Sequence, residues 1–345
     1  LSRLPGVSIA RTGALGSQTS VFVRGASSEQ LLVVVDGVRV NEVAAAGGGY
    51  DFANLSAGGL ERIELLRGSN SLIWGSEAIA GVLAVTSRQP EGVEASAEYG
   101  SNQSFDGQAS AGLAGERYSV AVTGGYSRSD GVSAAAVGTE DDGFRQWRIA
   151  GRGRFEFTPG LSASVNARYT DIRTDLDGYP APAYAFADTS EYLKMREASG
   201  RAGLDYTSEA LDLGAGFAVS ETRRGFYDPE SPFPQPNYTT KGQRQRAELR
   251  GQFRVTDTVR VDFGGDHEWT RLEAGASDKK ARIASGHALL GWYGERLSLA
   301  AGVRLDDHSR FGSQWTFGAN GSFAVIDDLR VKASYGEGFK APTLY

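Results

Sequence analysis

From about residue 94 onward, hydrophobic and polar residues alternate with a period of two over stretches of roughly ten residues. Residues 246–255 carry an apolar side chain or glycine at every second position, with charged or amide side chains between them. The pattern recurs in the ranges 147–157, 161–169, 211–219 and 297–305. Because successive side chains of a strand point to opposite faces, this pattern predicts β-strands with one apolar and one polar face. Long strands of this kind are typical of transmembrane β-barrels, although an antiparallel sandwich with a solvated face is an alternative.

Short turns and longer loops alternate between these segments. Short turns are predicted at 115–116, 158–160, 208–209, 256–257, 294–295 and 326–328, and longer loops at 129–145, 173–194, 223–239, 273–282 and 308–313. One rim of short turns and one of long loops is the arrangement of outer-membrane barrels. We count about 13 strands between Ala95 and Gly336. Because single-chain bacterial barrels have even strand numbers and must close, the sequence predicts part of a larger barrel.

The first 88 residues follow a different pattern. Short strands are predicted at Val21–Arg24, Leu31–Asp36, Arg62–Arg67 and Ala80–Thr86, and a short helical turn at Ser56–Leu60. The run LLVVV within Leu31–Asp36 predicts a strand buried on both faces, and the Asp36-Gly37 pair predicts a tight turn after it. The sequence therefore divides into a small mixed α/β domain, residues 1–88, and a barrel domain, residues 89–345.

Composition narrows the functional classes. The chain has 345 residues and no cysteine, which excludes a disulfide scaffold and thiolate metal sites. Its net charge of −6 argues against nucleic acid as a partner, because no basic face accumulates. No run of 18 apolar residues occurs, so no transmembrane helix is predicted.

Four motifs in the N-terminal domain resemble the plug of TonB-dependent outer-membrane receptors. They are LSRLPGVSI (1–9), VFVRG (21–25), LLVVVDGVRVN (31–41) and ERIELLRGSNSLIWGSEAIAGVLAV (61–85). Farther along, DGF (142–144) and SYGEGFKAPTLY (334–345) resemble the barrel of the same family. The resemblance implies an α/β plug inside a barrel expected to have 22 strands, located in the bacterial outer membrane.

The resemblance also implies a function and a set of partners. It implies active transport of a scarce nutrient, driven by TonB and its ExbB–ExbD complex, in contact with outer-membrane lipid and lipopolysaccharide. The first plug strand and the TonB box are expected before Leu1, and the last barrel strands after Tyr345.

Within the family, the short loops are most similar to those of cobalamin (vitamin B12) receptors, which implies cobalamin as the ligand. The matching plug loops span residues 41–52 and 69–74, and their small residues offer backbone amides to a bulky ligand. The predicted ligand-binding residues are Asn41, Ala44, Gly47, Gly48, Gly49, Tyr50, Ser71 and Trp74. The alternative is a flexible surface loop of small residues.

Two arginines, Arg24 and Arg67, each precede a glycine at a predicted strand end. In the family, arginines at such positions pair with barrel glutamates and lock the plug, so the resemblance implies this role here. The alternative is a strand-end charge that reaches water.

Acidic residues in two long loops suggest a metal site. Asp177, Asp188 and Asp228 match loop positions where cobalamin receptors are similar in using aspartates, and the resemblance implies a Ca²⁺ site there. The chain departs from that pattern in having fewer aspartates and Lys241 close by. A solvated acidic loop is the alternative.

Other functional classes find little support in the sequence. The three histidines show no metal-binding or catalytic spacing, and no P-loop or Ser-His-Asp motif occurs, so no enzyme is predicted. The same histidines argue against a barrel phospholipase. A ferric-siderophore or haem receptor is the main alternative within the family. A passive porin is a distant alternative, because it has no use for a plug-sized domain.

Overall fold

The computed structural model describes residues 1–136 and 138–345, so one residue of the loop predicted at 129–145 lies outside the described part. The N-terminal strands are β1 (Val7–Arg11), β2 (Thr19–Val23), β3 (Leu31–Val35), β4 (Val38–Arg39), β5 (Leu60–Arg67) and β6 (Gly81–Ser87). The helical segments are η1 (Ser28–Gln30), η2 (Ala46–Gly48), η3 (Phe52–Asn54) and α1 (Ser71–Trp74). No helix in these described ranges is long and apolar enough to cross a membrane.

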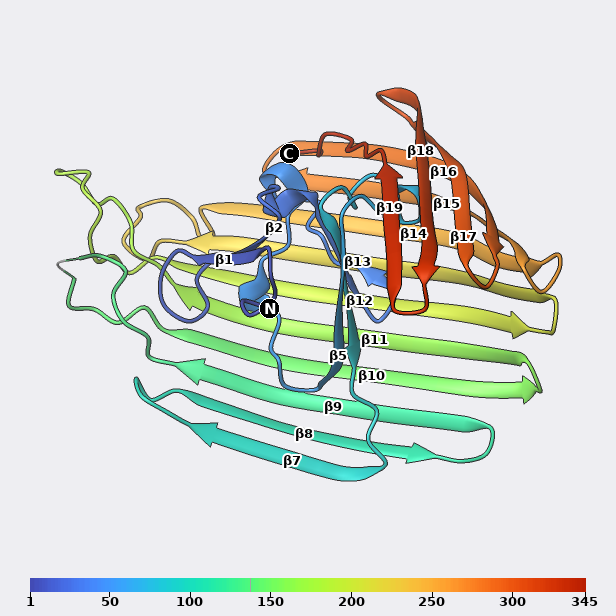
Figure 1. Cartoon of the computed structure of the whole chain (residues 1–345). Coiled ribbons are helices and arrows are strands. Elements are labelled where there is room, and N and C mark those ends of the chain that lie inside the picture. Colours follow the sequence, from blue (N-terminus) through green and yellow to red (C-terminus); the bar gives the residue numbers. More distant parts are fainter. Residues whose placement is uncertain (137) are drawn as a thin grey trace.

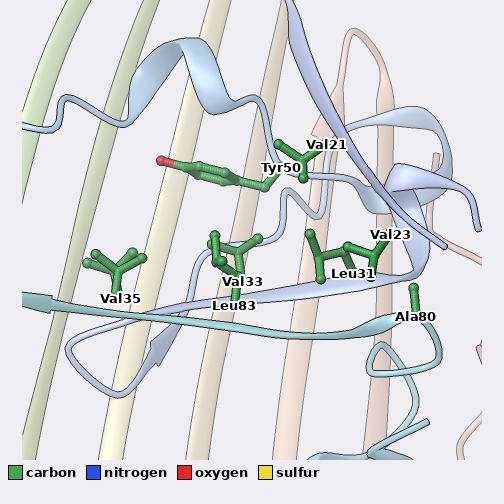
Figure 2. Packing of buried hydrophobic residues seen from close by; sticks show 9 residues of the cluster. Val21, Val23, Leu31, Val33, Val35, Tyr50, Ala80 and Leu83 are labelled. Carbon is green, nitrogen blue, oxygen red and sulfur yellow. The ribbon is translucent and has the colours of Figure 1, made fainter. Parts of the chain in front are cut away.

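The plug core is built around β3. The sheet order is β4-β3-β6-β5, with β3 parallel to β6 and the other pairs antiparallel. Leu31, Val33 and Val35 pack on one face of β3 with Tyr50 and strand β2 (Figure 2), while the intervening residues of β3 pack with Ala78 and Trp74 on the other. The predicted burial of both faces is confirmed. The predicted Asp36-Gly37 turn is confirmed too, because both residues have the positive φ that a two-residue hairpin turn needs.

The rest of the chain forms one sheet of 13 antiparallel strands, each paired with its neighbours in sequence. These strands are β7 (Gly92–Tyr99), β8 (Phe105–Ala114), β9 (Tyr118–Ser129), β10 (Phe144–Thr158), β11 (Leu161–Asp175), β12 (Tyr192–Thr207), β13 (Leu211–Tyr227), β14 (Tyr238–Arg254), β15 (Val259–Ala274), β16 (Ser277–Tyr293), β17 (Leu297–His308), β18 (Gly312–Ile326) and β19 (Leu329–Gly336). The sheet curves around the blue N-terminal elements, so that the red strands run in a different direction from the green ones (Figure 1). A plug with a barrel-type sheet is therefore confirmed, and the sandwich alternative is wrong.

The alternation of side chains gives this sheet two different faces. Trp147, Ile149 and Leu249 are about half exposed on its outer face, and the intervening Gln146 and Arg246 are buried on its inner face. The apolar face therefore points outward and the polar face points toward the plug. The division at residue 88 stays a prediction, with β6 ending at Ser87 and β7 beginning at Gly92. The total of 22 strands also stays a prediction.

Three local predictions are wrong. Ser56–Leu60 is not helical, because Gly58 and Gly59 interrupt it and Gly59 has a φ of 75°. The loop predicted at 273–282 is a two-residue turn between Ala274 and Ser277, stabilised by the Arg271–Asp278 ion pair of the flanking strands. The loop predicted at 308–313 shrinks to the three residues between β17 and β18. In the first of these loops, the charged residues Asp278 and Lys279 of an exposed strand end resemble loop sequence.

Candidate functional site

The plug contacts the sheet through a buried network of charged side chains. Arg39, at the end of β4, lies 3.4 Å from the Glu268 carboxylate of β15. Arg244 of β14 lies 3.1 Å from the same carboxylate and 2.7 Å from Glu77 of the plug. Arg244 also donates a hydrogen bond of 3.2 Å to the Asn41 carbonyl. We call Arg39, Glu77, Arg244 and Glu268 the interface network.

The inner face of the sheet continues this network. Arg246 pairs with Asp266 at 3.2 Å and with Glu248 at 2.9 Å, and Glu248 pairs with Arg201 at 3.0 Å. The guanidinium of Arg304, 1% exposed, lies 3.1 Å from Asp266. Charges buried to this extent must be paired, because an isolated buried charge costs several kcal/mol.

Separate polar contacts hold the plug at three other places. The Glu42 carboxylate lies 2.5 Å from Arg224 of β13, and burial raises the pKa of Glu42 against the opposing effect of this arginine. Asn166 of β11 donates to the Asp36 carbonyl at 2.9 Å, and Gln146 of β10 donates to the Asn54 carbonyl at 3.0 Å.

Most apolar side chains of the plug pack against one another and not against the sheet. The two largest apolar clusters consist of plug residues alone. Ala44 is a plug residue that packs against the sheet side chain Leu272, in a smaller cluster. The apolar core of the plug is therefore complete without the sheet, and the plug meets the sheet mainly through polar side chains.

The predicted lock residues make other contacts. Arg67 is exposed and donates to the Pro5 carbonyl at 3.0 Å, which is a contact within the plug. Arg24 is exposed beside Gly6 and Gly68, also within the plug. Among the described residues, two arginines of the range 1–88 form ion pairs with a glutamate of the sheet: Arg39 with Glu268, and Arg88, at the domain boundary, with Glu94. The family-derived role of Arg24 and Arg67 stays a prediction.

Several predicted ligand-binding residues are buried. The Asn41 side chain, 2% exposed, accepts from the Val33 amide at 2.7 Å and donates to the Leu31 carbonyl at 2.9 Å. Ala44, Tyr50 and Ser71 are also buried, and Tyr50 belongs to the plug core. These four side chains support the plug in the described structure. Their ligand contacts stay a prediction.

The remaining predicted residues lie near the segment that follows β19. Gly47 accepts a hydrogen bond of 2.6 Å from Lys340, and a Cβ at Gly48 would lie 3.0 Å from Thr343. Gly49 is half-buried beside the backbone of Glu29, and Trp74 packs half-buried against Ala78. Residues 340–344 therefore line one side of the glycine-rich loop, with a cavity of about 60 Å³ between them and the interface network.

A larger cavity separates the plug from strands β8 to β10. Its volume is about 370 Å³, and its lining combines the apolar Phe52, Leu55 and Phe144 with the charged Arg11 and Asp106. Apolar walls with a few polar groups are typical of ligand pockets. A hollow of about 740 Å³ near Phe155 and Leu204 belongs to the apolar outer face of the sheet and lies away from the plug.

The acidic loop residues connect two loops of the sheet. Asp177 accepts from the Ala135 amide at 2.7 Å, and Asp188 accepts from the Thr139 and Glu140 amides at 2.6 and 2.9 Å. Asp228 lies in a third loop and accepts from the Glu230 amide. Outside residue 137, no group of three acidic or histidine side chains is arranged to hold a metal. The calcium site stays a prediction.

Asp142 lies in the loop between β9 and β10, and we expect it to make the stability of this loop depend on pH. Burial, with Asp177, Glu140 and Asp175 nearby, raises its pKa to about 6 from an ordinary value of 3.8. The folded loop therefore binds more protons than the unfolded loop between these values, and its stability falls as pH rises from about 4 to 6. We expect Asp142→Asn to abolish this dependence, measured by hydrogen exchange of the loop amides. Exchange that slows with rising pH in the unmodified protein would contradict the assignment.

The exposed neighbour Asp141 provides the control. Asp141→Asn removes one carboxylate from the same loop, and we expect the pH dependence to persist.

Backbone hydrogen bonds from Glu140 and Thr139 lower the pKa of Asp188, so its stabilising effect is present above the ordinary pKa and is lost below it. This second effect lies at lower pH than the Asp142 window.

Two sequence profiles match this chain. Residues 1–82 match the TonB-dependent receptor plug domain, and residues 208–345 match the TonB dependent receptor-like β-barrel. Together the two matches cover more than half of the chain. Both profiles describe a receptor family and not a family of enzymes.

Solved siderophore receptors share the fold. The siderophore receptor PirA from Acinetobacter baumannii superposes with a TM-score of 0.75 at 19% identity, covering 99% of this chain and 58% of PirA. A mutant ferric enterobactin receptor PfeA from Pseudomonas aeruginosa, in complex with enterobactin, gives 0.76 at 20% identity, covering 99% and 60%. The ferric yersiniabactin uptake receptor FyuA from Yersinia pestis gives 0.76 at 18% identity, covering 98% and 61%. The chain thus spans about 60% of the length of these receptors.

Proposed function

Because this chain carries the plug and barrel domains of TonB-dependent receptors, we propose that it takes part in active transport of a metal chelate across the bacterial outer membrane. The observation that supports this function best is the buried, charged interface between plug and sheet. A passive pore has no use for such an interface. TonB, with its ExbB–ExbD complex, is the proposed source of the force that acts on the plug.

In this proposal, transport depends on separating the interface network. Glu268 contacts both Arg39 of the plug and Arg244 of the sheet, so displacement of the plug breaks the Arg39 pair and leaves the Arg244 pair within the sheet. The two sheet residues of the network, Arg244 and Glu268, thereby keep each other as partners, which limits the cost of opening there. The outer end of the plug, including the glycine-rich loop, faces the proposed ligand.

Cobalamin is our first candidate ligand, on the similarity of the loops to those of cobalamin receptors. Asp177, Asp188 and Asp228 would contribute to a Ca²⁺ site in the outer loops of such a receptor. A ferric siderophore is the second candidate. It is favoured by the similarity to receptors described as taking siderophores, ferric enterobactin and ferric yersiniabactin. Both candidates are bulky metal chelates.

Calorimetry on the detergent-purified protein tests the ligand. We expect cyanocobalamin to bind with a nanomolar Kd that weakens when calcium is chelated, and ferric enterobactin to bind far more weakly. Asp177→Asn with Asp188→Asn should reproduce the effect of the chelator, whereas the exposed control Asp141→Asn should not. Tight binding of ferric enterobactin alone would replace cobalamin with the second candidate. Failure of both chelates to bind, or uptake that persists without TonB, would overturn the proposed function.

A further inference from the structure

The segment 336–344, which follows β19, lies across the plug and is fixed to the sheet at both ends. At its start, the Glu337 amide donates to the Phe317 carbonyl of β18 at 3.0 Å, and the Glu337 carboxylate accepts from the Phe317 amide at 3.0 Å. At its end, Leu344 is buried in a cluster with Leu272 of β15. The red chain after β19 accordingly runs back to the blue plug elements (Figure 1). We call residues 336–344 the strap.

The strap contacts both plug loops that the sequence predicts as ligand-binding. Near its start, the Ser69 hydroxyl donates to the Glu337 carbonyl, and a Cβ on Gly336 would lie 3.3 Å from the Ser69 Cβ. Near its end, a Cβ on Gly48 would lie 3.0 Å from the Thr343 side chain. One continuous stretch that is anchored in the sheet therefore connects the two loops.

Lys340, in the middle of the strap, bonds directly to the glycine-rich loop, residues 46–49. Its ammonium donates to the Gly47 carbonyl at 2.6 Å and also to the Glu29 carbonyl of η1. These two carbonyls belong to different segments of the plug, so a single side chain holds both segments against the strap. Hydrogen bonds from a charged donor are stronger than those between neutral groups.

Glu29 packs against the same loop through its side chain. A Cβ on Gly47 would lie 2.0 Å from the carboxyl carbon of Glu29, so the bare glycine leaves the space that this carboxylate occupies. Gly47 and Gly48 have φ angles of 73° and 70°, which glycine adopts without strain. Because residues 46–49 carry no side chain larger than a methyl group, the contacts with Glu29 and with the strap fix the loop.

A run of three glycines is costly to order. Glycine loses more conformational freedom on ordering than any other residue, so Gly47–Gly49 would be mobile without external contacts. A ligand that had to order this run on binding would lose affinity, whereas a loop that is already ordered binds more tightly. A donor that holds the loop before the ligand arrives therefore contributes to affinity without touching the ligand.

We propose that Lys340 is a positioning residue, which orders the glycine-rich loop from the strap and so raises the affinity of the protein for its metal chelate. The effect on affinity rests on the proposed function, whereas the ordering of the loop does not. Because the strap is fixed to the sheet through Glu337 and Leu344, Lys340 orders the loop relative to the sheet and not only within the plug.

Hydrogen exchange of the detergent-purified protein, without any chelate, tests the ordering. The Glu42 amide donates to the Gly49 carbonyl and the Gly48 amide to the Ala45 carbonyl, both at 3.1 Å, so these two amides report on the loop. We expect Lys340→Met, which keeps most of the side-chain length but removes the donor, to make both amides exchange at least about tenfold faster. The amides of β3 should exchange as before, because the plug core does not depend on the strap.

Lys332→Met is the matched control, because Lys332 is an exposed lysine of β19 outside the strap. It should leave the exchange of the loop amides unchanged. Calorimetry with cyanocobalamin and with ferric enterobactin tests the affinity. Whichever chelate binds the unmodified protein should bind Lys340→Met about tenfold more weakly and Lys332→Met equally well. In TonB-dependent uptake, the half-saturating concentration of that chelate should rise by the same factor while the maximal rate stays the same.

Four other outcomes are decisive. Unchanged exchange of the loop amides in Lys340→Met would overturn the ordering role. Exchange that accelerates equally in the loop and in β3 would overturn it as well, because Lys340 would then support the plug as a whole. Faster loop exchange with unchanged chelate affinity would overturn the role in binding. If neither chelate binds the unmodified protein, the proposed function fails, and the exchange measurements still decide whether Lys340 orders the loop.

Discussion

Replacing Glu268 with glutamine is expected to destabilise the docked plug by about 3–5 kcal/mol. The carboxylate of Glu268 is shared by Arg39 and Arg244, and all three side chains are no more than 7% exposed. Glutamine keeps the shape but removes the charge, which leaves Arg39 buried without its ion-pair partner. The free energy of docking is measured by releasing the plug with urea and monitoring its release by the protease sensitivity of residues 1–88.

Glu273 provides a matched control on the same strand. It pairs with Arg271 at 3.0 Å, and both side chains are more than a third exposed. Glu273→Gln should therefore change plug stability by less than about 1 kcal/mol, because exposed ion pairs contribute little. If Glu268→Gln is no more destabilising than Glu273→Gln, the interface network does not hold the plug.

The sheet could be predicted from the sequence because its signal is local. The alternation of apolar and polar residues within each strand depends on the pleat alone, so it identified the strands and the face that points outward. The plug strand β3 was predictable for the same reason, since five consecutive apolar residues fit a strand buried on both faces. The short turns followed from glycine and polar pairs between alternating segments.

The interface network could not be predicted, because its members are far apart in the chain. Arg39 and Glu268 are separated by 229 positions, and nothing in either local sequence specifies the other. Glu268 and Arg244 do occupy the polar face of alternating strands, which is a signal that they point inward. That signal does not distinguish them from other inward charges. The prediction of Arg24 and Arg67 as lock residues followed from the resemblance, because each of them precedes a glycine at a predicted strand end.

Asn41 shows how a structural role and a ligand contact give the same signal in the sequence. In sequence, a polar residue at the start of a glycine-rich segment suits a ligand contact. In the structure, its amide instead satisfies backbone groups of Leu31 and Val33 on β3. Buried backbone N–H and C=O groups need hydrogen-bond partners in any fold. An asparagine whose side chain bonds to such groups looks the same in the sequence as an asparagine that binds a ligand.

A disulfide between plug and sheet should block uptake almost completely. A Cβ built on Gly318 of β18 lies 3.7 Å from the Cβ of Leu72 in α1, which matches the spacing of a disulfide. The chain contains no other cysteine, so Leu72→Cys with Gly318→Cys should form a single defined bridge. If the plug must move relative to β18 during transport, the oxidised protein should lose more than about 90% of TonB-dependent uptake. The reason is that a disulfide, unlike an ion pair, does not separate when the plug is pulled.

The reduced form of the same variant is the internal control. Reduction should restore uptake to the level of the single variants Leu72→Cys and Gly318→Cys, and ligand binding should be the same in both redox states. Such a result would assign the loss to movement and not to a damaged site. Unchanged uptake by the fully oxidised protein would mean that the α1 contact with β18 stays closed during transport. The opening would then have to occur elsewhere, and the interface network, on β14 and β15, would be the next place to introduce a bridge.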